Sequence, residues 1–144
     1  MSLHGTYDPQ NVFAQIIRGE APCYKLFEDE DVLAFLDIFP QSFGHTLVIP
    51  KRSAARNILE IEADALAKVM AVVQRLTHVL VKELEPAGVQ VAQFNGAPAG
   101  QTVFHIHMHI VPRFEGESLG IHASKKADPN ELEALQARLL KHLQ

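Results

Sequence analysis

The chain has almost no capacity for covalent cross-linking and nothing that resembles an export signal. Cys23 is the only cysteine among 144 residues, so no disulfide can form within the chain. The first residues lack the charged stretch followed by an apolar stretch that is typical of a secretory signal. We therefore expect a cytoplasmic protein that has no membrane partner.

Basic residues are also sparse. The formal net charge is −4 at pH 7, and the sequence contains no run of Lys or Arg. Because nucleic-acid binding depends on such residues to neutralise phosphates, the composition argues against a nucleic-acid partner. The three cations Lys51, Arg52 and Arg113 are enough for one small anion.

No internal repeat, low-complexity segment or long linker divides the chain. With 144 residues, of which 47% are hydrophobic, it is long enough for one well-packed domain and too short for two. We expect a single domain over residues 1–144, with a loose segment at 1–10 and a C-terminal loop and helix at 114–144.

The spacing of apolar residues predicts an α+β fold. Between residues 62 and 85 they recur at i, i+3 and i+4, which is typical of one long amphipathic helix. Turn residues and short apolar runs predict two further helices, at 11–18 and 128–143. Five strands are predicted at 24–28, 32–37, 45–49, 89–94 and 103–111.

The most informative segment is residues 104–113, with the sequence FHIHMHIVPR. His105, His107 and His109 alternate with apolar residues, and alternate side chains of a β-strand point to the same face. The pattern therefore predicts a strand with imidazoles on one face and core residues on the other. A half-exposed strand can be polar on its solvent side without any chemical role, but three titratable side chains of one kind favour a functional site.

Crowded imidazoles indicate two kinds of chemistry. Because the ordinary pKa of histidine is about 6.5, some of the three rings must stay neutral near pH 7. A neutral imidazole acts as a covalent nucleophile or as a ligand of zinc or another transition metal, and the spacing does not separate these roles. The preceding loop, residues 95–102, has two glycines followed by Gln101 and Thr102, whose donors suit a phosphoryl group.

Residues 100–113, GQTVFHIHMHIVPR, resemble the signature of the histidine triad (HIT) family, in which three histidines alternate with apolar residues after a Gly-Gln-Ser/Thr lead. The resemblance extends upstream to residues 13–22, 27–38 and 40–51, and it covers about residues 11–115. It implies a five-stranded antiparallel sheet with one long helix and short terminal helices. It also implies a homodimer in which two such sheets join.

The resemblance further implies a nucleotide hydrolase or transferase with a ping-pong mechanism. His107 would attack the α-phosphorus of a purine nucleotide conjugate or dinucleoside polyphosphate, and water would resolve the resulting nucleotidyl-histidine. His109 would help with the proton balance, while His105 and His45 would form supporting hydrogen bonds. Asp37 would accept hydrogen bonds from the ribose hydroxyls. The base would lie against apolar neighbours, among them Phe13, Phe35 and Ile38.

Each of these residues also has a structural explanation. His45 would suit a hydrogen-bonded position at the start of a strand, and Asp37 would suit the end of a strand before the turn at Pro40. The apolar neighbours would be buried in a core whether or not a base is bound.

Two departures from the family pattern affect the expected site. Many bacterial members hold a structural zinc with a Cys-x-x-Cys pair and a further histidine, and the matching positions here are Asn11, Ala14 and Ser53. We therefore expect no metal site and no required cofactor, apart from a divalent cation carried by polyphosphate substrates. Many members also have an Asn or Gln at the position of Phe94, which makes the adjacent Asn95 a candidate for nucleotide binding.

The predicted activity is cleavage at the α-phosphate of a nucleotide through a covalent nucleotidyl-histidine. The Pro112-Arg113 pair after the histidines resembles dinucleoside polyphosphate hydrolases and many bacterial members of the family. A nucleoside phosphoramidase of the same fold is the leading alternative. Two alternatives from other classes are a metal-dependent hydrolase and a nucleotide-binding module without catalysis.

Overall fold

The computed structural model describes residues 2–117 and 125–143, so residues 118–124 of the predicted C-terminal loop lie outside the described part. The helices and strands follow in the order α1 (Val12–Ile17), β1 (Lys25–Glu28), β2 (Val32–Leu36), β3 (Thr46–Pro50), α2 (Ala63–Leu84), β4 (Gly88–Ala92), the 3-10 turn η1 (Ala97–Ala99), β5 (Met108–Arg113) and α3 (Pro129–Leu140).

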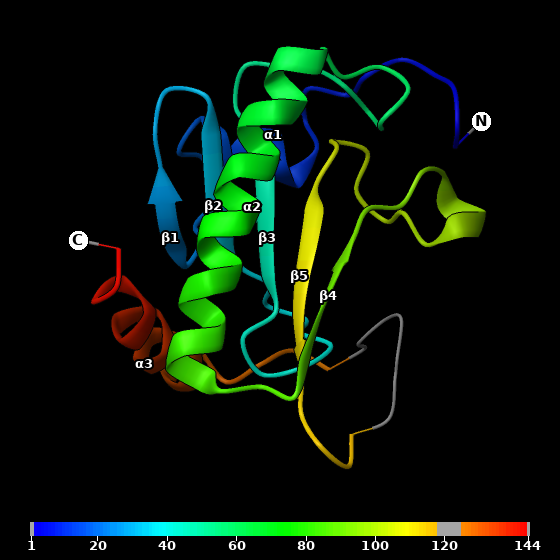
Figure 1. Ribbon diagram of the computed structural model, residues 1–144. Helices are drawn as coiled ribbons and strands as arrows, with labels where there is room; N and C mark the ends of the chain where they lie inside the picture. Colours follow the sequence, from blue (N-terminus) through cyan, green and yellow to red (C-terminus); the bar gives the residue numbers. More distant parts are fainter. Residues whose placement is uncertain (1, 118–124, 144) are drawn as a thin grey trace.

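The strands form one five-stranded sheet in the order β1-β2-β3-β5-β4, and every neighbouring pair is antiparallel (Figure 1). Each predicted strand and helix is therefore present, and the predicted α+β class is confirmed. The connection from β3 to β4 passes through α2, which lies across the sheet in Figure 1. Because of this crossover, the last strand in the chain, β5, fills the place between β3 and β4.

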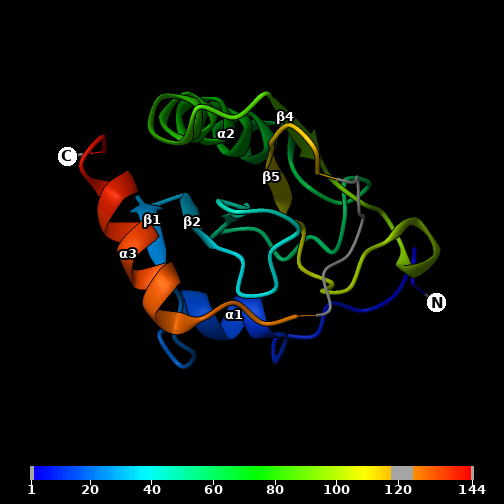
Figure 2. The same cartoon turned by 90° about the horizontal axis from the view of Figure 1, so that it is seen from below.

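The sheet lies between α2 on one face and α1 on the other (Figure 2). Successive residues of β2 belong to two different apolar clusters. Val32 and Ala34 belong to the large core, which lies against α2 and α3. Leu33 and Phe35 belong to the small core on the side of α1, whose buried members are Phe13, Leu33, Phe35, Leu47 and Ile49. Since a strand alternates its side chains between faces, a strand buried on both faces must be apolar throughout, as β2 is.

The long helix α2 is amphipathic, as its spacing predicts. It turns Val69, Val73, Leu76 and Leu80 toward the sheet, where all four are buried. His78 lies on its exposed side. No helix in residues 2–117 or 125–143 is both long and apolar enough to cross a membrane.

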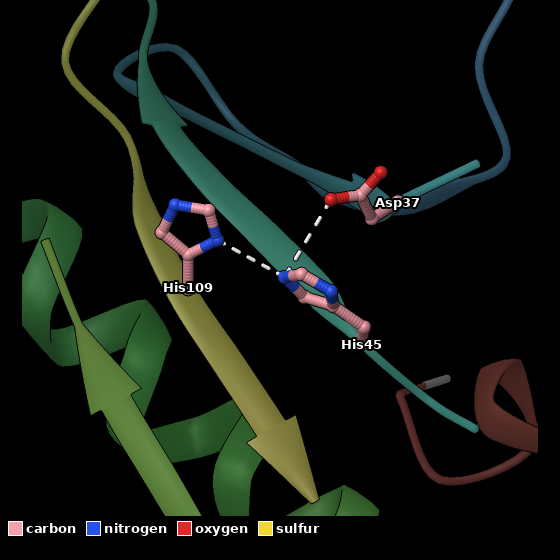
Figure 3. Close-up of side chains that lie close together, drawn as sticks. All are labelled: Asp37, His45 and His109. Atoms are coloured by element: carbon pink, nitrogen blue, oxygen red, sulfur yellow. Dashed lines mark hydrogen bonds and ion pairs between the residues drawn. The ribbon is translucent and has the colours of Figure 1, made fainter. Parts of the chain in front are cut away.

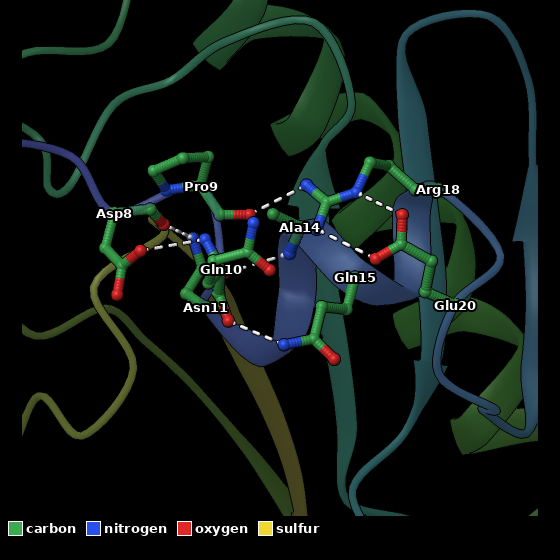
Figure 4. Close-up of polar contacts among 8 residues, drawn as sticks. All are labelled: Asp8, Pro9, Gln10, Asn11, Ala14, Gln15, Arg18 and Glu20. Atoms are coloured by element: carbon green, nitrogen blue, oxygen red, sulfur yellow. Dashed lines mark hydrogen bonds and ion pairs between the residues drawn. The ribbon is translucent and has the colours of Figure 1, made fainter.

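A cap and a tied turn fix the start of α1 (Figure 4). Asn11 Oδ1 accepts a hydrogen bond from the N–H of Ala14 at 2.9 Å, which satisfies one of the donors exposed at the helix start. The Asn11 amide also donates to the carbonyl of Asp8 at 2.7 Å. Arg18, just after the helix, donates to the carbonyl of Pro9 at 2.7 Å. These bonds hold the chain before α1 against the helix.

The strand predicted to carry all three histidines is shorter than expected, because β5 includes His109 but neither His105 nor His107. The reason is a local competing bond: His107 Nδ1 lies 2.8 Å from the carbonyl oxygen of His105, two residues earlier. Between them, the N–H of Ile106 donates to the carbonyl of Ala55, outside the sheet, at 3.0 Å. The prediction of one imidazole face on one strand was therefore wrong.

Gly44 lies at a crowded position directly before His45. Its φ of +94° is in the region that favours glycine, and an added Cβ would lie 2.6 Å from Leu84 Cδ1 and 3.3 Å from Pro112 Cγ. We expect Gly44→Ala to lower the free energy of unfolding by about 2–4 kcal/mol, from backbone strain and overpacking together. Chemical denaturation followed by circular dichroism measures this change.

Gly19→Ala is the matched control for this prediction. Gly19 also has a positive φ, of +79°, but an added Cβ would meet nothing within 4 Å. Gly19→Ala should therefore lower the free energy of unfolding only by the backbone strain, about 1–2 kcal/mol. If the two variants lost the same free energy of unfolding, the overpacking expected at Gly44 would be contradicted.

Candidate functional site

The pairing of β2, β3 and β5 brings three polar side chains together on the small-core face. Asp37 follows β2 and His45 precedes β3, and the N–H of Asp37 donates to the carbonyl of His45 at 2.9 Å, which extends the pairing by one step. Leu47 of β3 is paired with His109 of β5. Because His45 and Leu47 are two residues apart, they share a face with His109.

A cleft of about 570 Å³ opens on this face, a volume typical of small-molecule sites. Apolar residues form most of its wall, among them Val12, Phe13, Ile16, Phe35, Ile38 and Leu47. The polar lining residues include Asp37, His45, Thr102, His107 and His109. The ligand atoms of Asp37, His45 and His109 lie within 4.8 Å of one another, and the ring centroids of His107 and His109 are 4.9 Å apart. The cleft therefore offers an apolar surface for a flat group together with a polar cluster that contains two of the three triad histidines.

His107 is held as a neutral ring with a defined proton position. A carbonyl oxygen only accepts hydrogen bonds, so the contact with the His105 carbonyl places a proton on His107 Nδ1. Burial lowers the pKa of His107 to about 4, against a smaller opposing effect of that hydrogen bond. The ring of Phe13 packs against it edge to face, with centroids 4.9 Å apart. The Nε2 atom of His107 thus carries a lone pair at the cleft.

His105 lies behind the cleft and does not line it. Its Nε2 lies 2.9 Å from the carbonyl oxygen of Pro50, and its Nδ1 lies 2.7 Å from the hydroxyl of Tyr7. The first contact places the proton on Nε2, so Nδ1 accepts from Tyr7. Burial lowers the pKa of His105 below its ordinary value. His105 therefore supports the site from behind, and its carbonyl holds His107.

His45, His109 and Asp37 form a second polar group at the cleft (Figure 3). The N–H of Gln41 donates to His45 Nδ1 at 3.0 Å, so the proton of the neutral ring is on Nε2. This Nε2 lies 3.0 Å from His109 Nδ1 and 3.5 Å from Asp37 Oδ2. Burial, with the positive charge of Arg113 as a smaller cause, lowers the pKa of His45 to about 4. The contact with Asp37 is therefore no ion pair near pH 7.

Proton positions follow for His109 and Asp37. Because His45 donates to His109 Nδ1, a neutral His109 carries its proton on Nε2. Burial raises the pKa of Asp37 to about 6, although the N–H of Phe39 donates to its Oδ1 at 2.8 Å and opposes this effect. At neutral pH Asp37 is an ionised carboxylate at the edge of a mostly apolar cleft.

The glycine-containing loop contributes Thr102 to the cleft but not Gln101. The Gln101 side chain is buried and accepts from the N–H of Gly96 at 2.8 Å. It also donates to the carbonyl of Arg56 at 2.6 Å and to that of Val103 at 3.1 Å. The predicted role of Gln101 as a direct donor to a ligand is therefore replaced by a role in fixing the loop.

Asn95 also lies outside the cleft. Its Oδ1 accepts from the N–H of Ile58 and from the Gln93 side chain, each at 2.9 Å. The preceding residue, Phe94, packs its ring against His109 with centroids 5.0 Å apart. The structure does not bring the Asn95 amide to the position that Phe94 occupies, because neighbouring residues point in different directions.

The positions that the resemblance to the HIT family associates with zinc do not offer a zinc-binding set here. Asn11 Oδ1 caps α1, Ala14 has no ligand atom, and both ring nitrogens of His105 are hydrogen-bonded. Ser53 contributes only a buried hydroxyl without a hydrogen-bond partner. Zinc prefers thiolate and imidazole ligands, so these residues do not fit it.

Within the described residues, one further group has the spacing of a metal site. The ligand atoms of Asp37, His45 and His109 all lie within 4.8 Å of one another. A histidine that binds a metal must present an unprotonated nitrogen to it, and usually donates from the other nitrogen. At His45 the arrangement is reversed, since Nδ1 accepts from the backbone of Gln41. The group fits a hydrogen-bonded chain better than a cation site.

Leu47, Gln41 and Tyr7 are among the residues at the site that the sequence did not predict. Leu47 lines the cleft, and its place two residues after His45 in a strand would have identified it. Gln41 lines the cleft and fixes the His45 ring through its backbone, which carries no sequence signal. Tyr7 belongs to the segment expected to be loose, and its contact with His105 spans 98 residues of sequence.

Comparisons with known proteins agree with this geometry. Residues 18–116 match the HIT domain family. The chain is 39% identical over 136 residues to "Protein hit" of Bacillus subtilis, which spans 92% of this chain and 93% of that protein. It is 40% identical over 126 residues to adenosine 5'-monophosphoramidase hnt1 of Schizosaccharomyces pombe, covering 86% of this chain and 91% of that protein. It is 41% identical over 108 residues to adenylylsulfatase HINT3 of Arabidopsis thaliana, covering 75% of this chain and 54% of that protein.

A solved structure supports the same assignment. The crystal structure of a Hit-like protein from Bartonella henselae matches with a TM-score of 0.87 and 40% sequence identity, and the match covers 96% of this chain and 99% of that one. Nearly the whole of each chain takes part in the match. The family match, the relatives and the shared fold agree: this chain belongs to the HIT family.

Proposed function

We propose that this protein cleaves nucleotides at the α-phosphate through a covalent nucleotidyl-His107 intermediate. The observation that carries the proposal is the proton position of His107. Its Nδ1 donates to the His105 carbonyl, so the lone pair of a neutral ring lies on Nε2 at the cleft. A neutral, oriented imidazole next to a second imidazole is the arrangement that covalent catalysis requires.

Hydrolysis of nucleotides is supported at the coarse level by the family. One relative is named an adenosine 5'-monophosphoramidase and another an adenylylsulfatase. Both names describe enzymes that release a group from an adenylate. The combination of an apolar wall and clustered polar side chains in the cleft suits such a substrate here.

In the first step, the lone pair of His107 Nε2 forms a bond to the α-phosphorus, and the bond from phosphorus to the leaving group breaks. The leaving group departs with the bonding electrons and takes its proton from solvent, and His109, whose ring centroid lies 4.9 Å from that of His107, would donate a hydrogen bond to it from Nε2–H. The negative charge that develops on the phosphoryl oxygens would be stabilised by donors of the loop that contains Thr102.

In the second step, water attacks the phosphorus of the nucleotidyl-histidine and the P–N bond breaks. The lone pair returns to His107 Nε2, and the proton that water releases passes to the solvent. The product is a nucleoside monophosphate.

The nucleoside would occupy the rest of the cleft. The Asp37 carboxylate would accept hydrogen bonds from the two ribose hydroxyls, and the base would lie against Phe13, Phe35 and Ile38. An apolar wall recognises a flat ring system and suits a purine, the larger of the two base classes.

A phosphoramidase that acts by the same two steps is the second candidate. It is favoured by the 40% identity to the named monophosphoramidase of Schizosaccharomyces pombe. Comparing the turnover of adenosine phosphoramidate with that of diadenosine polyphosphate separates the two substrates. Chelation tests the alternative of a metal-dependent hydrolase, which would lose its activity. Detection of a phosphohistidine adduct tests the alternative of a binding module without catalysis, which would form none.

We also propose a homodimer formed through β4 and α2. β4 is the edge of the sheet, and Val91 on it is 45% exposed. Met70 and Val81 are exposed apolar residues on α2. An uncovered strand edge next to exposed apolar side chains is a surface that a second copy would bury. The cytoplasmic location expected from the sequence stays a prediction, tested by cell fractionation.

The first prediction for this site concerns the nucleophile. His107→Ala should lower the turnover of a nucleotide substrate by at least about 1,000-fold, because no other group can form the intermediate. It should keep its fold and still bind a nucleoside monophosphate. Acid-quenched mass spectrometry of the parent should detect a nucleotidyl adduct that the variant lacks. His78→Ala, on the exposed side of α2, is the matched control. Turnover of the His107 variant within about tenfold of the parent would contradict the mechanism.

The second prediction is that the chemical step needs no metal. Neither the Asn11, Ala14 and Ser53 positions nor His45 with its protonated Nε2 suits a cation. Elemental analysis of the purified protein should find no stoichiometric zinc, and exhaustive chelation should leave phosphoramidate hydrolysis unchanged. Full loss on chelation, reversed by added zinc, would instead support the metal-dependent hydrolase.

The third prediction concerns Asp37 and the ribose. Since hydrogen bonds to a charged group are worth about 1.5–3 kcal/mol, AMP should bind the parent more tightly than 2'-deoxy-AMP at neutral pH. Asp37→Asn should reduce this difference in affinity between AMP and 2'-deoxy-AMP. Lowering the pH through about 6 should narrow it in the parent too, because the carboxyl with its raised pKa then becomes protonated. Isothermal titration calorimetry gives both affinities. A ratio unaffected by the substitution would mean that Asp37 only ends its strand.

A further inference from the structure

Tyr7 is hydrogen-bonded to a histidine of the site although the two residues are 98 positions apart in the sequence. Its hydroxyl oxygen is 2.7 Å from His105 Nδ1, and the two rings also pack, with centroids 5.7 Å apart. Tyr7 lies before residues 18–116, which match the HIT domain family. The N-terminal segment therefore supplies a contact to the site from outside the family-matched part of the chain.

The segment that carries Tyr7 is fixed on both sides of it. Before Tyr7, the carbonyl of Leu3 accepts from the Asn57 side chain at 2.8 Å. After it, the carbonyl of Asp8 accepts from the N–H of Asn11 at 3.2 Å and from its side chain at 2.7 Å. These hydrogen bonds fix the backbone before and after Tyr7, and so they help to place its hydroxyl beside His105.

The contact has a defined direction. His105 Nε2 donates to the carbonyl of Pro50, so its Nδ1 must accept, and the Tyr7 hydroxyl is the donor. Ser53, which lines the same small hollow beside His105, has a buried hydroxyl with no hydrogen-bond partner and does not fill this role. Both nitrogens of His105 are thus satisfied, and the ring is held at two opposite points.

From His105 the constraint continues to His107. The carbonyl of His105 accepts from His107 Nδ1 at 2.8 Å, and this bond leaves the lone pair of Nε2 at the cleft. The segment around His105 is outside β5, so the ladder of the sheet does not fix it. The backbone at this point is held by the side chain of His105 and by the bond from the Ile106 N–H to Ala55.

We propose that Tyr7 is a positioning residue for the nucleophile: by donating to His105 Nδ1 it fixes the His105 backbone, whose carbonyl orients His107. The inference rests on the proposed role of His107 in catalysis. It assigns to the segment before α1 a part in the chemical step without any contact between Tyr7 and substrate.

The test compares three single variants of the full chain. In Tyr7→Phe only the hydroxyl is removed, and kcat should fall by about three- to tenfold, the rate equivalent of one hydrogen bond, while the Kd of AMP stays the same. Tyr7→Leu should lower kcat at least as much as Tyr7→Phe does. Tyr24→Phe removes the same atom from the only other tyrosine, which packs on the large core, and it should leave kcat unchanged.

Two kinetic results would overturn the proposal. If Tyr7→Phe turned over substrate like the parent while Tyr7→Leu did not, the Tyr7 ring would act by packing alone. If Tyr7→Phe lowered kcat equally in the parent and in a His105→Gln background, Tyr7 would not act through His105. Non-additive losses in this double-mutant cycle are the expected result.

A spectroscopic readout keeps the test independent of activity. NMR of protein labelled with ¹⁵N at histidine follows the Nδ1 proton of His107 without any substrate. In Tyr7→Phe this proton should exchange with water faster than in the parent, and in Tyr24→Phe it should not. An unchanged exchange rate in Tyr7→Phe would overturn the proposal. If the parent hydrolysed no nucleotide, this measurement would still decide the positioning role, so the two failures are distinguishable.

Discussion

Burial of the imidazoles is the constraint on which the rest of the site depends. His45, His105 and His107 are shielded from water, and the pKa of each lies below its ordinary value, so all three are neutral at pH 7. A neutral ring has one donor and one acceptor nitrogen, and each must meet a group of the opposite kind. The backbone supplies these groups at Gln41, at Pro50 and at His105 itself. The path of the main chain therefore determines where the protons are.

Much of the fold could be predicted because long periodic segments are buried on one face. The helix predicted at 62–85 is α2, which differs by one residue at each end. The strands β2 and β3 are found within one residue of their predicted bounds. The alternation of side chains between the two faces of a strand also accounts for the meeting of Asp37 and His45, since both continue a strand on the same face. Burial of a helix or strand requires apolar residues at regular intervals, and this spacing can be recognised in the sequence.

The parts of the site that could not be predicted depend on contacts without a period. A bond between the His107 ring and the His105 carbonyl displaces the strand pattern that the alternation predicts. Gln101 and Asn95 have donors and acceptors that suit a ligand equally well, but backbone groups of the loops bind them instead. The contact of Tyr7 joins segments 98 residues apart. Such partners are chosen by the three-dimensional path of the loops, which composition and spacing do not encode.

The small core has a second function as the wall of the cleft. Phe13, Phe35 and Leu47 are nearly inaccessible to water and also line the space proposed for the base. A larger or smaller side chain at any of them changes the shape offered to the ligand and the packing of the sheet at once. At these three positions, a change in the shape of the cleft and a change in thermal stability are therefore coupled.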